Sequence, residues 1–553
     1  MFVGSRGEVQ QVKGGPGEFR GCPGTHMLPH QFARLVLRHV SCWSASGPAG
    51  WRAGFGAAVT TTLAGAMTTG GFATHAEAQS LKQSMIAAYR INPALQSQRF
   101  RTRASDEGVA EARAGYRPRV SADAYAGITT DRGNRGGEGD GKTYGAGLSI
   151  EQPLFDGFQT HYAINEAKSG VLASRNDLAA QENEILLQTA SAYFDVLRDE
   201  GVVLYRRKAL NGLKRELIGA HQRMDHGDAT VTDVEQSRQR VALAEADLER
   251  AKSQLEISRL KFARIVGIAP RDLRMPKLPT RFMPKSRRRA VEVALVESPV
   301  IAAALNQHDA ARHAVGKAKG ALLPSASLVG GYDRSFNDRT TTTRDEDDLS
   351  LVGRVRVPLY QGGGASARVR RARALALSRD REVIDQRNRI GEAVGAAWSE
   401  LTAARRRLGL EQSAVASAER ALKGIREEQR VGSRTLTDVL DAERELVNAR
   451  IRHLETRRDL NVSAFALLRA MGTLTIENFA PEIERYKPDE HYQQVNAKWW
   501  GTATPATRSD ALLGASGTQR SPERARGANR LGAGNAASRA EARAGWQTTI
   551  KQR

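Results

Sequence analysis

Two short segments share the pattern Gly-x-x-Thr-x-x-Asp-Val, and they carry the residues best suited to chemistry. They span residues 227–234 and 432–439. The glycine suits the left-handed residue that ends a helix, and the threonine suits the N-cap of the next helix. The aspartate follows three residues later, where a carboxylate completes a capping box and complements the helix dipole. These residues are Gly227, Thr230 and Asp233 in the first copy and Gly432, Thr435 and Asp438 in the second.

The second copy carries two charges that the first copy lacks at the matching positions. Arg434 stands where the first copy has Ala229, and Asp441 stands where it has Gln236. Asp441 lies one turn further into the helix, so capping does not require it. The second copy therefore has the composition of an electrostatic site, in which carboxylates and an arginine act on ions or on neighbouring helices.

Other residues with chemical potential form no recognisable site. His221 and His226 are five residues apart, as are His308 and His313, so neither pair shares a helical face as metal ligands would. Both cysteines lie in the first fifty residues. We therefore expect no enzyme activity, no catalytic residue, no cofactor and no metal site.

The formal net charge of +22 raises the possibility of nucleic-acid binding, which needs Lys and Arg to neutralise phosphates. Residues 1–78 account for +3 of this charge and residues 501–553 for +6, which leaves +13 for the middle. There arginine and glutamate are interspersed along helix-like stretches, which is typical of a solvated helical face. We therefore expect no nucleic-acid partner.

The N-terminal region has the features of a targeting segment. Arg52 precedes an uncharged stretch over 53–73, and Ala76-Glu77-Ala78 fits signal-peptidase cleavage. Residues 1–78 are therefore predicted to be a presequence with a signal peptide, and the mature chain is predicted to start near Gln79. Beyond Ala78 no run of eighteen apolar residues follows, so any membrane crossing is assigned to strands.

The middle of the chain is an internal duplication. Asn92-Pro93 matches Ser298-Pro299 at a spacing of 206, and Thr232-Asp233-Val234 matches Thr437-Asp438-Val439 at a spacing of 205. A spacing that is shared over almost two hundred residues indicates two copies of one structural unit. The predicted repeats are residues 79–273 and 274–480. Residues 481–553 are predicted to be a disordered C-terminal tail, because the chain after about Trp500 is rich in Ala, Gly, Ser, Thr and Arg with little periodicity.

Each repeat begins with a helix and a strand pair. A helix over residues 80–115 is expected to stop before Pro118, because a residue that precedes proline avoids the α region. Alternating apolar and polar residues then predict a hairpin with one apolar face. The expected strands surround a Gly-rich loop over 133–141 in the first repeat and a polar loop over 337–348 in the second.

These strands have the length that a tilted strand needs to cross a bilayer. Four strands cannot close a barrel, and lipid tolerates no unpaired strand edge, so several copies must share one barrel. Two copies would give eight strands and a barrel filled by side chains. Three copies would give twelve strands and leave an open lumen. A transport function needs an open lumen and therefore favours three copies.

Two long helices follow each hairpin. The first is expected over about 157–224 and again over 363–430, on the order of 100 Å long. The second begins near Val231 and Leu436 and carries a strict heptad of large residues, with small residues between them. This pattern indicates helices packed side by side over a great length, in a cylinder wall or in an ordinary coiled coil.

The order of elements, the duplication and the segment Val431-Gly432-Ser433-Arg434-Thr435-Leu436-Thr437-Asp438-Val439-Leu440-Asp441-Ala442 resemble the TolC family of outer-membrane efflux and type I secretion proteins. The resemblance implies a mainly α fold in which each chain gives four strands to a trimeric, twelve-stranded outer-membrane β-barrel. An α-helical barrel would continue it into the periplasm. It also implies a homotrimer in outer-membrane lipid, a periplasmic adaptor protein, and an inner-membrane pump of the RND or ABC type.

The resemblance also suggests roles for the charged residues. We expect Asp438 and Asp441 of three subunits to form a periplasmic gate selective for cations, with Asp233 nearby. Arg434 would hold the gate closed through ion pairs to a neighbouring helix. Gln429 stands where the best-known members of the family have a tyrosine.

The alternative is a soluble long-helix coiled-coil scaffold or a basic nucleic-acid-binding protein. Such a protein should lack the alternating hairpins and would need no signal peptide.

Overall fold

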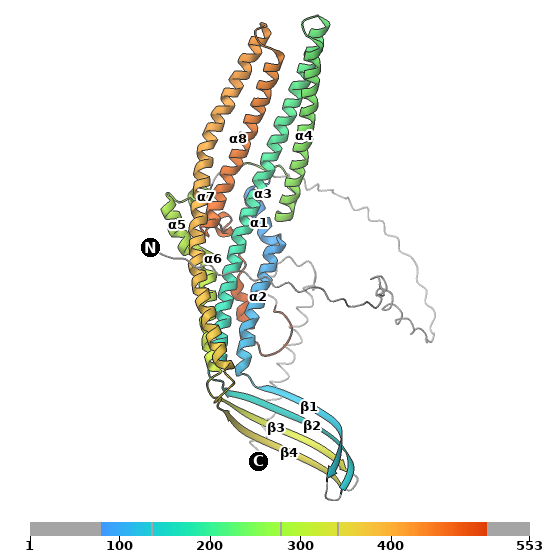
Figure 1. The fold of residues 1–553 in the computed structure, drawn as a ribbon, viewed down its shortest axis with the longest axis vertical. Coiled ribbons are helices and arrows are strands. Elements are labelled where there is room, and N and C mark those ends of the chain that lie inside the picture. Colours follow the sequence, from blue (N-terminus) through green and yellow to red (C-terminus); the bar gives the residue numbers. More distant parts are fainter. Residues whose placement is uncertain (1–78, 134–136, 277–278, 340–341, 506–553) are drawn as a thin grey trace, which may run out of the picture. The chain divides into compact units, whose positions relative to one another are not determined.

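The computed structural model describes residues 79–505 except 134–136, 277–278 and 340–341 (Figure 1). The expected presequence, 1–78, and residues 506–553 lie outside this part. The described chain is mainly helical and has one four-stranded sheet. Its elements are α1 (Leu81–Ile91), α2 (Pro93–Arg113), the 3-10 helix η1 (Ala114–Tyr116), β1 (Arg119–Gly133), β2 (Gly137–Phe155), α3 (Gln159–Asp225), α4 (Val231–Val266), the 3-10 helix η2 (Thr280–Phe282), α5 (Arg287–Glu297), α6 (Pro299–Gly320), β3 (Ser325–Arg339), β4 (Thr342–Arg356), α7 (Gly364–Arg430), α8 (Leu436–Ala470), α9 (Ile476–Phe479) and α10 (Pro488–Val495).

The helix expected over residues 80–115 is two helices. Asn92 ends α1 and caps α2, because its side-chain oxygen accepts hydrogen bonds from the backbone N–H groups of Ala94 and Leu95. Pro93 takes the first position of α2, where no intrahelical donor is needed. The second repeat also breaks before a proline, at Ser298 between α5 and α6, but there the serine side chain makes no capping hydrogen bond.

The four strands form one antiparallel sheet in the order β1-β2-β3-β4. The hairpin strands are longer than predicted, since β2 already begins at Gly137 and β4 at Thr342. Much of the two expected loops is therefore strand, with Asn337 opposite Arg344. The prediction relied on apolar side chains, whereas the backbone ladder also pairs polar residues.

Large apolar side chains lie exposed along the sheet. Val120 on β1 is 64% exposed and Leu349 on β4 is 83% exposed. Leu351 and Val355 follow Leu349 at even spacing, so they share one face of β4, as the alternation predicted. One chain alone therefore presents an apolar surface of strands that its own helices do not cover.

The predicted long helices and hairpins are confirmed. The helices α3 and α7 each contain 67 residues, and α4 and α8 begin at Val231 and Leu436. In α4 the heptad residues are buried against α3. They are Val234, Val241, Leu248, Leu255 and Phe262. In Figure 1, α3 with α4 and α7 with α8 form two antiparallel helical pairs.

Shorter helices pack against the parts of α3 and α7 that lie next to the sheet. Helix α2 packs against α3, and α6 packs between α3 and α7. The turn before α3 needs close backbone approach, because a methyl group on Gly157 would lie 2.3 Å from the carbonyl oxygen of Gly320. Gly157 also has a φ of 68°, which favours glycine.

Among the described helices, none combines the length and the apolar composition that a transmembrane helix requires.

The segment after residue 480 differs from the predicted disordered tail as far as residue 505. Here α10 packs on α2, and its His491 is buried with Nδ1 3.0 Å from Oδ2 of Asp106. Arg113 donates hydrogen bonds to Asn496, and Arg117 donates one to the carbonyl of Lys498. These tertiary contacts order residues whose local composition gave no helical period.

Candidate functional site at the helical hairpin ends

The two hairpin turns are built by the repeated motif. Gly227 has a φ of 83° and Gly432 a φ of 79°, as expected for the residue that ends a helix. In the first turn Gly227 N–H donates to the carbonyl of Met224, and Asp228 N–H donates to that of Arg223. The second turn repeats both hydrogen bonds, so each long helix ends in a Schellman motif.

Both predicted capping boxes are present. The backbone N–H of Thr435 lies 3.0 Å from Oδ2 of Asp438, and the Asp438 N–H lies 3.3 Å from the Thr435 hydroxyl. Thr230 and Asp233 make the same pair at 2.9 and 3.2 Å. Hydrogen bonds from Thr435 lower the pKa of Asp438, and those from Thr230 lower the pKa of Asp233. Both carboxylates are thereby held in the ionised form.

Arg434 is paired within its own hairpin. Its Nε lies 2.9 Å from Oε2 of Glu428, near the end of α7. Both side chains are about half exposed, at 51% each. The ion pair joins the turn to the preceding helix. Its predicted role in holding a gate closed between subunits stays a prediction.

Asp441 connects the two hairpins. Its Oδ1 lies 2.8 Å from a guanidinium nitrogen of Arg240, which belongs to α4. One turn earlier, the Thr437 hydroxyl donates to the side-chain oxygen of Gln236 at 2.9 Å. Arg240 and Gln236 were not predicted as site residues. Heptad spacing places them on α4 but does not show that α8 lies opposite.

Apolar contacts support this connection between α4 and α8. Val234 of α4 is buried together with Leu436 and Leu440 of α8 and with Ala220 of α3. The polar pairs therefore flank a small buried cluster at the hairpin ends, which holds the second hairpin against the first.

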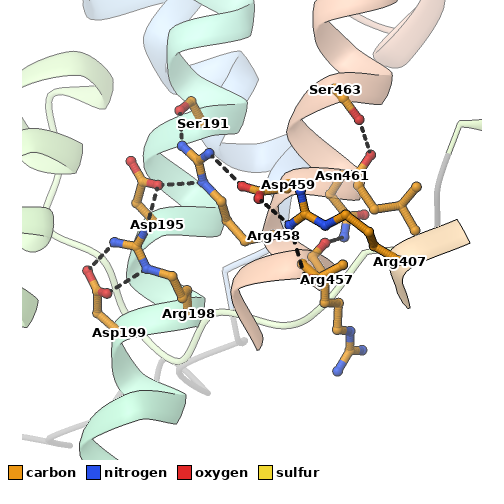
Figure 2. A network of polar contacts seen from close by, with 12 residues as sticks. Ser191, Asp195, Arg198, Asp199, Arg407, Arg457, Arg458, Asp459, Asn461 and Ser463 are labelled. Atoms are coloured by element: carbon orange, nitrogen blue, oxygen red, sulfur yellow. Dashed lines mark hydrogen bonds and ion pairs between the residues drawn. The ribbon is translucent and has the colours of Figure 1, made fainter. Parts of the chain in front are cut away.

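A second polar network joins the hairpins farther from their ends (Figure 2). The Asp195 carboxylate on α3 is only 8% exposed and accepts from Arg458 of α8 at 2.8 Å. It also accepts from Lys261 of α4 at 3.0 Å. One helical turn away on α3, Asp199 binds Arg198 and accepts from the Ser258 hydroxyl.

The same network reaches α7. A guanidinium nitrogen of Arg407 lies 3.4 Å from Asp459, whose other oxygen lies 3.2 Å from Arg458. Arg458 thus touches both Asp195 and Asp459, as Figure 2 shows. Side chains from all four long helices meet here, so this network fixes how the two hairpins lie together.

The chemistry available at these sites is electrostatic. Within the part of the chain that the structure describes, no group of three or more His, Cys, Asp or Glu side chains is placed to hold a metal ion. The carboxylates Asp233, Asp438 and Asp441 instead cap helices or pair with arginine. Such groups attract or repel ions and hold helices in place.

Comparison with known proteins agrees with this architecture. The sequence matches the family described as "Outer membrane efflux protein" over residues 87–268 and 290–473. It is 32% identical over 446 residues to the outer membrane efflux protein BepC of Brucella suis, covering 81% of this chain and 96% of that protein. It is also 27% identical to the outer membrane protein TolC of Vibrio cholerae, covering 72% of this chain and 92% of that protein.

A solved structure has the same fold. The Campylobacter jejuni CmeC outer membrane channel superposes with a TM-score of 0.64 at 16% identity, covering 75% of this chain and 89% of that chain. The predicted helical and β-barrel fold class is therefore confirmed. The alternatives of a soluble coiled-coil scaffold and a nucleic-acid-binding protein gain no support from these similarities. The chain belongs to the outer membrane efflux protein family, the TolC family, and acts in the outer membrane as the channel component of an efflux or secretion system rather than as an enzyme.

Proposed function

We propose that three copies of this chain form a duct with a twelve-stranded barrel in outer-membrane lipid and a helical tunnel in the periplasm. In this proposal the repeats are residues 79–273 and 274–480, after a presequence over 1–78. The two ranges that match the family, 87–268 and 290–473, lie inside these repeats and support the boundaries.

The observation that carries the proposal is the open sheet. Strand β1 pairs only with β2, and β4 pairs only with β3, within the described residues. Each outer strand therefore has a row of backbone donors and acceptors to satisfy, which costs several kcal/mol per group in hydrocarbon. Pairing β1 of one subunit with β4 of the next would remove both edges. Three subunits do so around an open lumen.

The hairpin ends are the proposed periplasmic gate. Three subunits would bring Asp438 and Asp441 around one axis, where carboxylates favour cations. The pairs Arg434–Glu428 and Arg240–Asp441 would hold the ends together in the resting state. Gln429 stands where the family has a tyrosine, so in this proposal the closed state depends more on the ion pairs of Arg434 and Arg240.

The proposed partners are a periplasmic adaptor protein and an inner-membrane pump of the RND or ABC type. The hairpin ends present apolar side chains for such a contact, since Val231 is 68% exposed and Val431 is 76% exposed. Relatives named for efflux, such as BepC, and for protease secretion, such as AprF of Pseudomonas aeruginosa, support this range of systems.

Planar-bilayer conductance tests the gate. The double variant Asp438→Ala, Asp441→Ala should conduct with a weaker preference for cations and a changed unit conductance. Glu445→Ala serves as a matched control, because Glu445 is an exposed carboxylate of α8 beyond the hairpin end. An unchanged cation preference in the double variant would remove these aspartates from the gate.

A further inference from the structure

A cavity lies between the two helical hairpins. Its volume is about 450 Å³, and side chains of α3, α4, α7 and α8 line it. Cavities of a few hundred cubic ångströms accommodate small organic molecules. The cavity sits beside the connection between α4 and α8, because Arg240 and Leu440 contribute to both.

The lining is strongly cationic. Seven of the lining side chains are arginine or lysine, whereas two are carboxylates. Lys208 of α3 and Arg444 of α8 form no ion pair or hydrogen bond with any residue of the described chain, and Arg215 of α3 has only a longer-range charge interaction with Glu443. These three cations face the cavity from both hairpins, so an anion inside it would gain charge-assisted hydrogen bonds from two sides.

Apolar side chains form the rest of the wall. They include Leu213, Leu243, Leu446 and Val447. A simple inorganic anion would leave this surface uncovered, whereas an anion with a rigid apolar body would bury it. We propose that the cavity is a binding site for small organic anions with an apolar body, such as aromatic sulfonates or carboxylates.

Arg240 links this site to the hairpin ends. Its guanidinium lines the cavity and also pairs with Asp441 at 2.8 Å. A bound anion competes with Asp441 for Arg240, so binding weakens the connection between α4 and α8. By thermodynamic linkage, removing the Asp441 charge must tighten anion binding. This consequence for gating rests on the proposed function, but the binding site itself does not.

Isothermal titration of the full chain in nanodiscs, with naphthalene-1,5-disulfonate as the probe, tests the site. We expect saturable binding that weakens as salt is raised. Arg444→Ala and Lys208→Ala should each weaken binding by about tenfold, the effect of one charged hydrogen bond. Arg238→Ala is the matched control, because Arg238 lies on α4 outside the cavity and should leave affinity unchanged.

The competition is tested with two further variants. Asp441→Asn should tighten probe binding by about threefold or more, whereas Arg240→Ala should weaken it. Equal binding of neutral 1,5-dihydroxynaphthalene, or no response to Arg444→Ala and Lys208→Ala, would overturn the proposal. These titrations do not measure conductance. The two proposals can therefore fail separately. If the probe binds with this pattern but the cation preference does not change when Asp438 and Asp441 are replaced, the gate is refuted and the binding site stands.

Discussion

At the scale of residues, the hairpin ends depend on a few backbone and capping requirements that recur in both repeats. Gly432 supplies a left-handed residue that ends α7, and Thr435 with Asp438 caps the N-terminus of α8. The turn residues 432–435 are themselves exposed, and the buried cluster of the hairpin ends begins only at Leu436, so the turn depends mainly on these local interactions. Substitutions here should therefore act through backbone geometry and ionisation.

Gly432→Ala and Gly424→Ala should have opposite effects. A methyl group at either position would meet no described atom within 4 Å, so packing does not distinguish them. Gly432 has a positive φ, and alanine there should cost about 1 kcal/mol. Gly424 lies inside α7, where alanine should stabilise by about 0.5–1 kcal/mol. Hydrogen exchange of the hairpin amides gives the opening free energy, and hence the change in local stability in each variant. A change of the same sign in both variants would contradict this explanation.

The capping box at Asp438 should weaken in acid. Hydrogen bonds from Thr435 lower the pKa of Asp438, so its ionised form stabilises the first turn of α8. That stabilisation is fully present above the unfolded pKa of about 3.9 and is lost as pH falls through the lower folded value. Protection factors of the first α8 amides should therefore be constant above about pH 5 and should fall below about pH 4.

Asp438→Asn tests this assignment, because an amide still accepts a hydrogen bond but does not titrate. The acid-induced loss should disappear from α8 and remain in α4, where Asp233 keeps its own capping box. Persistence of the loss in α8 would assign it to another group.

At the scale of elements, two separate connections hold the hairpins together. The hairpin ends meet through Asp441 with Arg240, and the network around Asp195 joins α3, α4, α7 and α8 farther along. The second connection is more buried, so its charges depend more strongly on their partners.

Arg458→Ala should lower the free energy of unfolding by about 2 kcal/mol, because the mostly buried Asp195 loses one of its cations. Lys261 still binds Asp195, which keeps the effect below that of an isolated buried charge. Arg457→Ala is the matched control, because the side chain of Arg457, next to Arg458 in the sequence, is exposed. This substitution should change the free energy of unfolding by less than about 0.5 kcal/mol. Thermal unfolding of the detergent-solubilised protein measures both, and equal shifts would contradict the assigned role.

At the scale of the whole molecule, one chain is incomplete in its sheet and its apolar strand surface is uncovered. In the proposed assembly β1 of one subunit lies beside β4 of the next, while β2 and β3 pair within a subunit. Strand pairing inside and between subunits can therefore be told apart by where a crosslink forms.

Cysteines at Asp123 on β1 and Arg354 on β4 should be joined between subunits by a short bis-maleimide. Denaturing gels should then show a band three times the monomer mass only when both cysteines are present. Both native cysteines, Cys22 and Cys42, lie within the predicted presequence, so background labelling should be low if this segment is cleaved as predicted. Cysteines at Tyr144 and Phe336, which pair across β2 and β3, form the control. They should crosslink without changing the mass. Monomers alone in the first experiment would contradict the shared barrel.

The sequence by itself determined the repeat, the long helices, the hairpin turns and the two capping boxes. These features depend on interactions within a few residues, or on a heptad that repeats without interruption, so local sequence is enough to specify them. The strand faces were also legible, because alternation reports which side is apolar. The ends of the strands were not, since polar residues such as Asn337 and Arg344 pair equally well in the backbone ladder.

Only the tertiary structure decided which charges meet. Asp441 lies 201 positions from Arg240, and Arg458 lies 263 positions from Asp195. No local pattern indicates such pairs, because they depend on the two repeats packing side by side. Packing likewise ordered the segment around His491, whose burial against Asp106 supplies the stabilisation that its own sequence lacks.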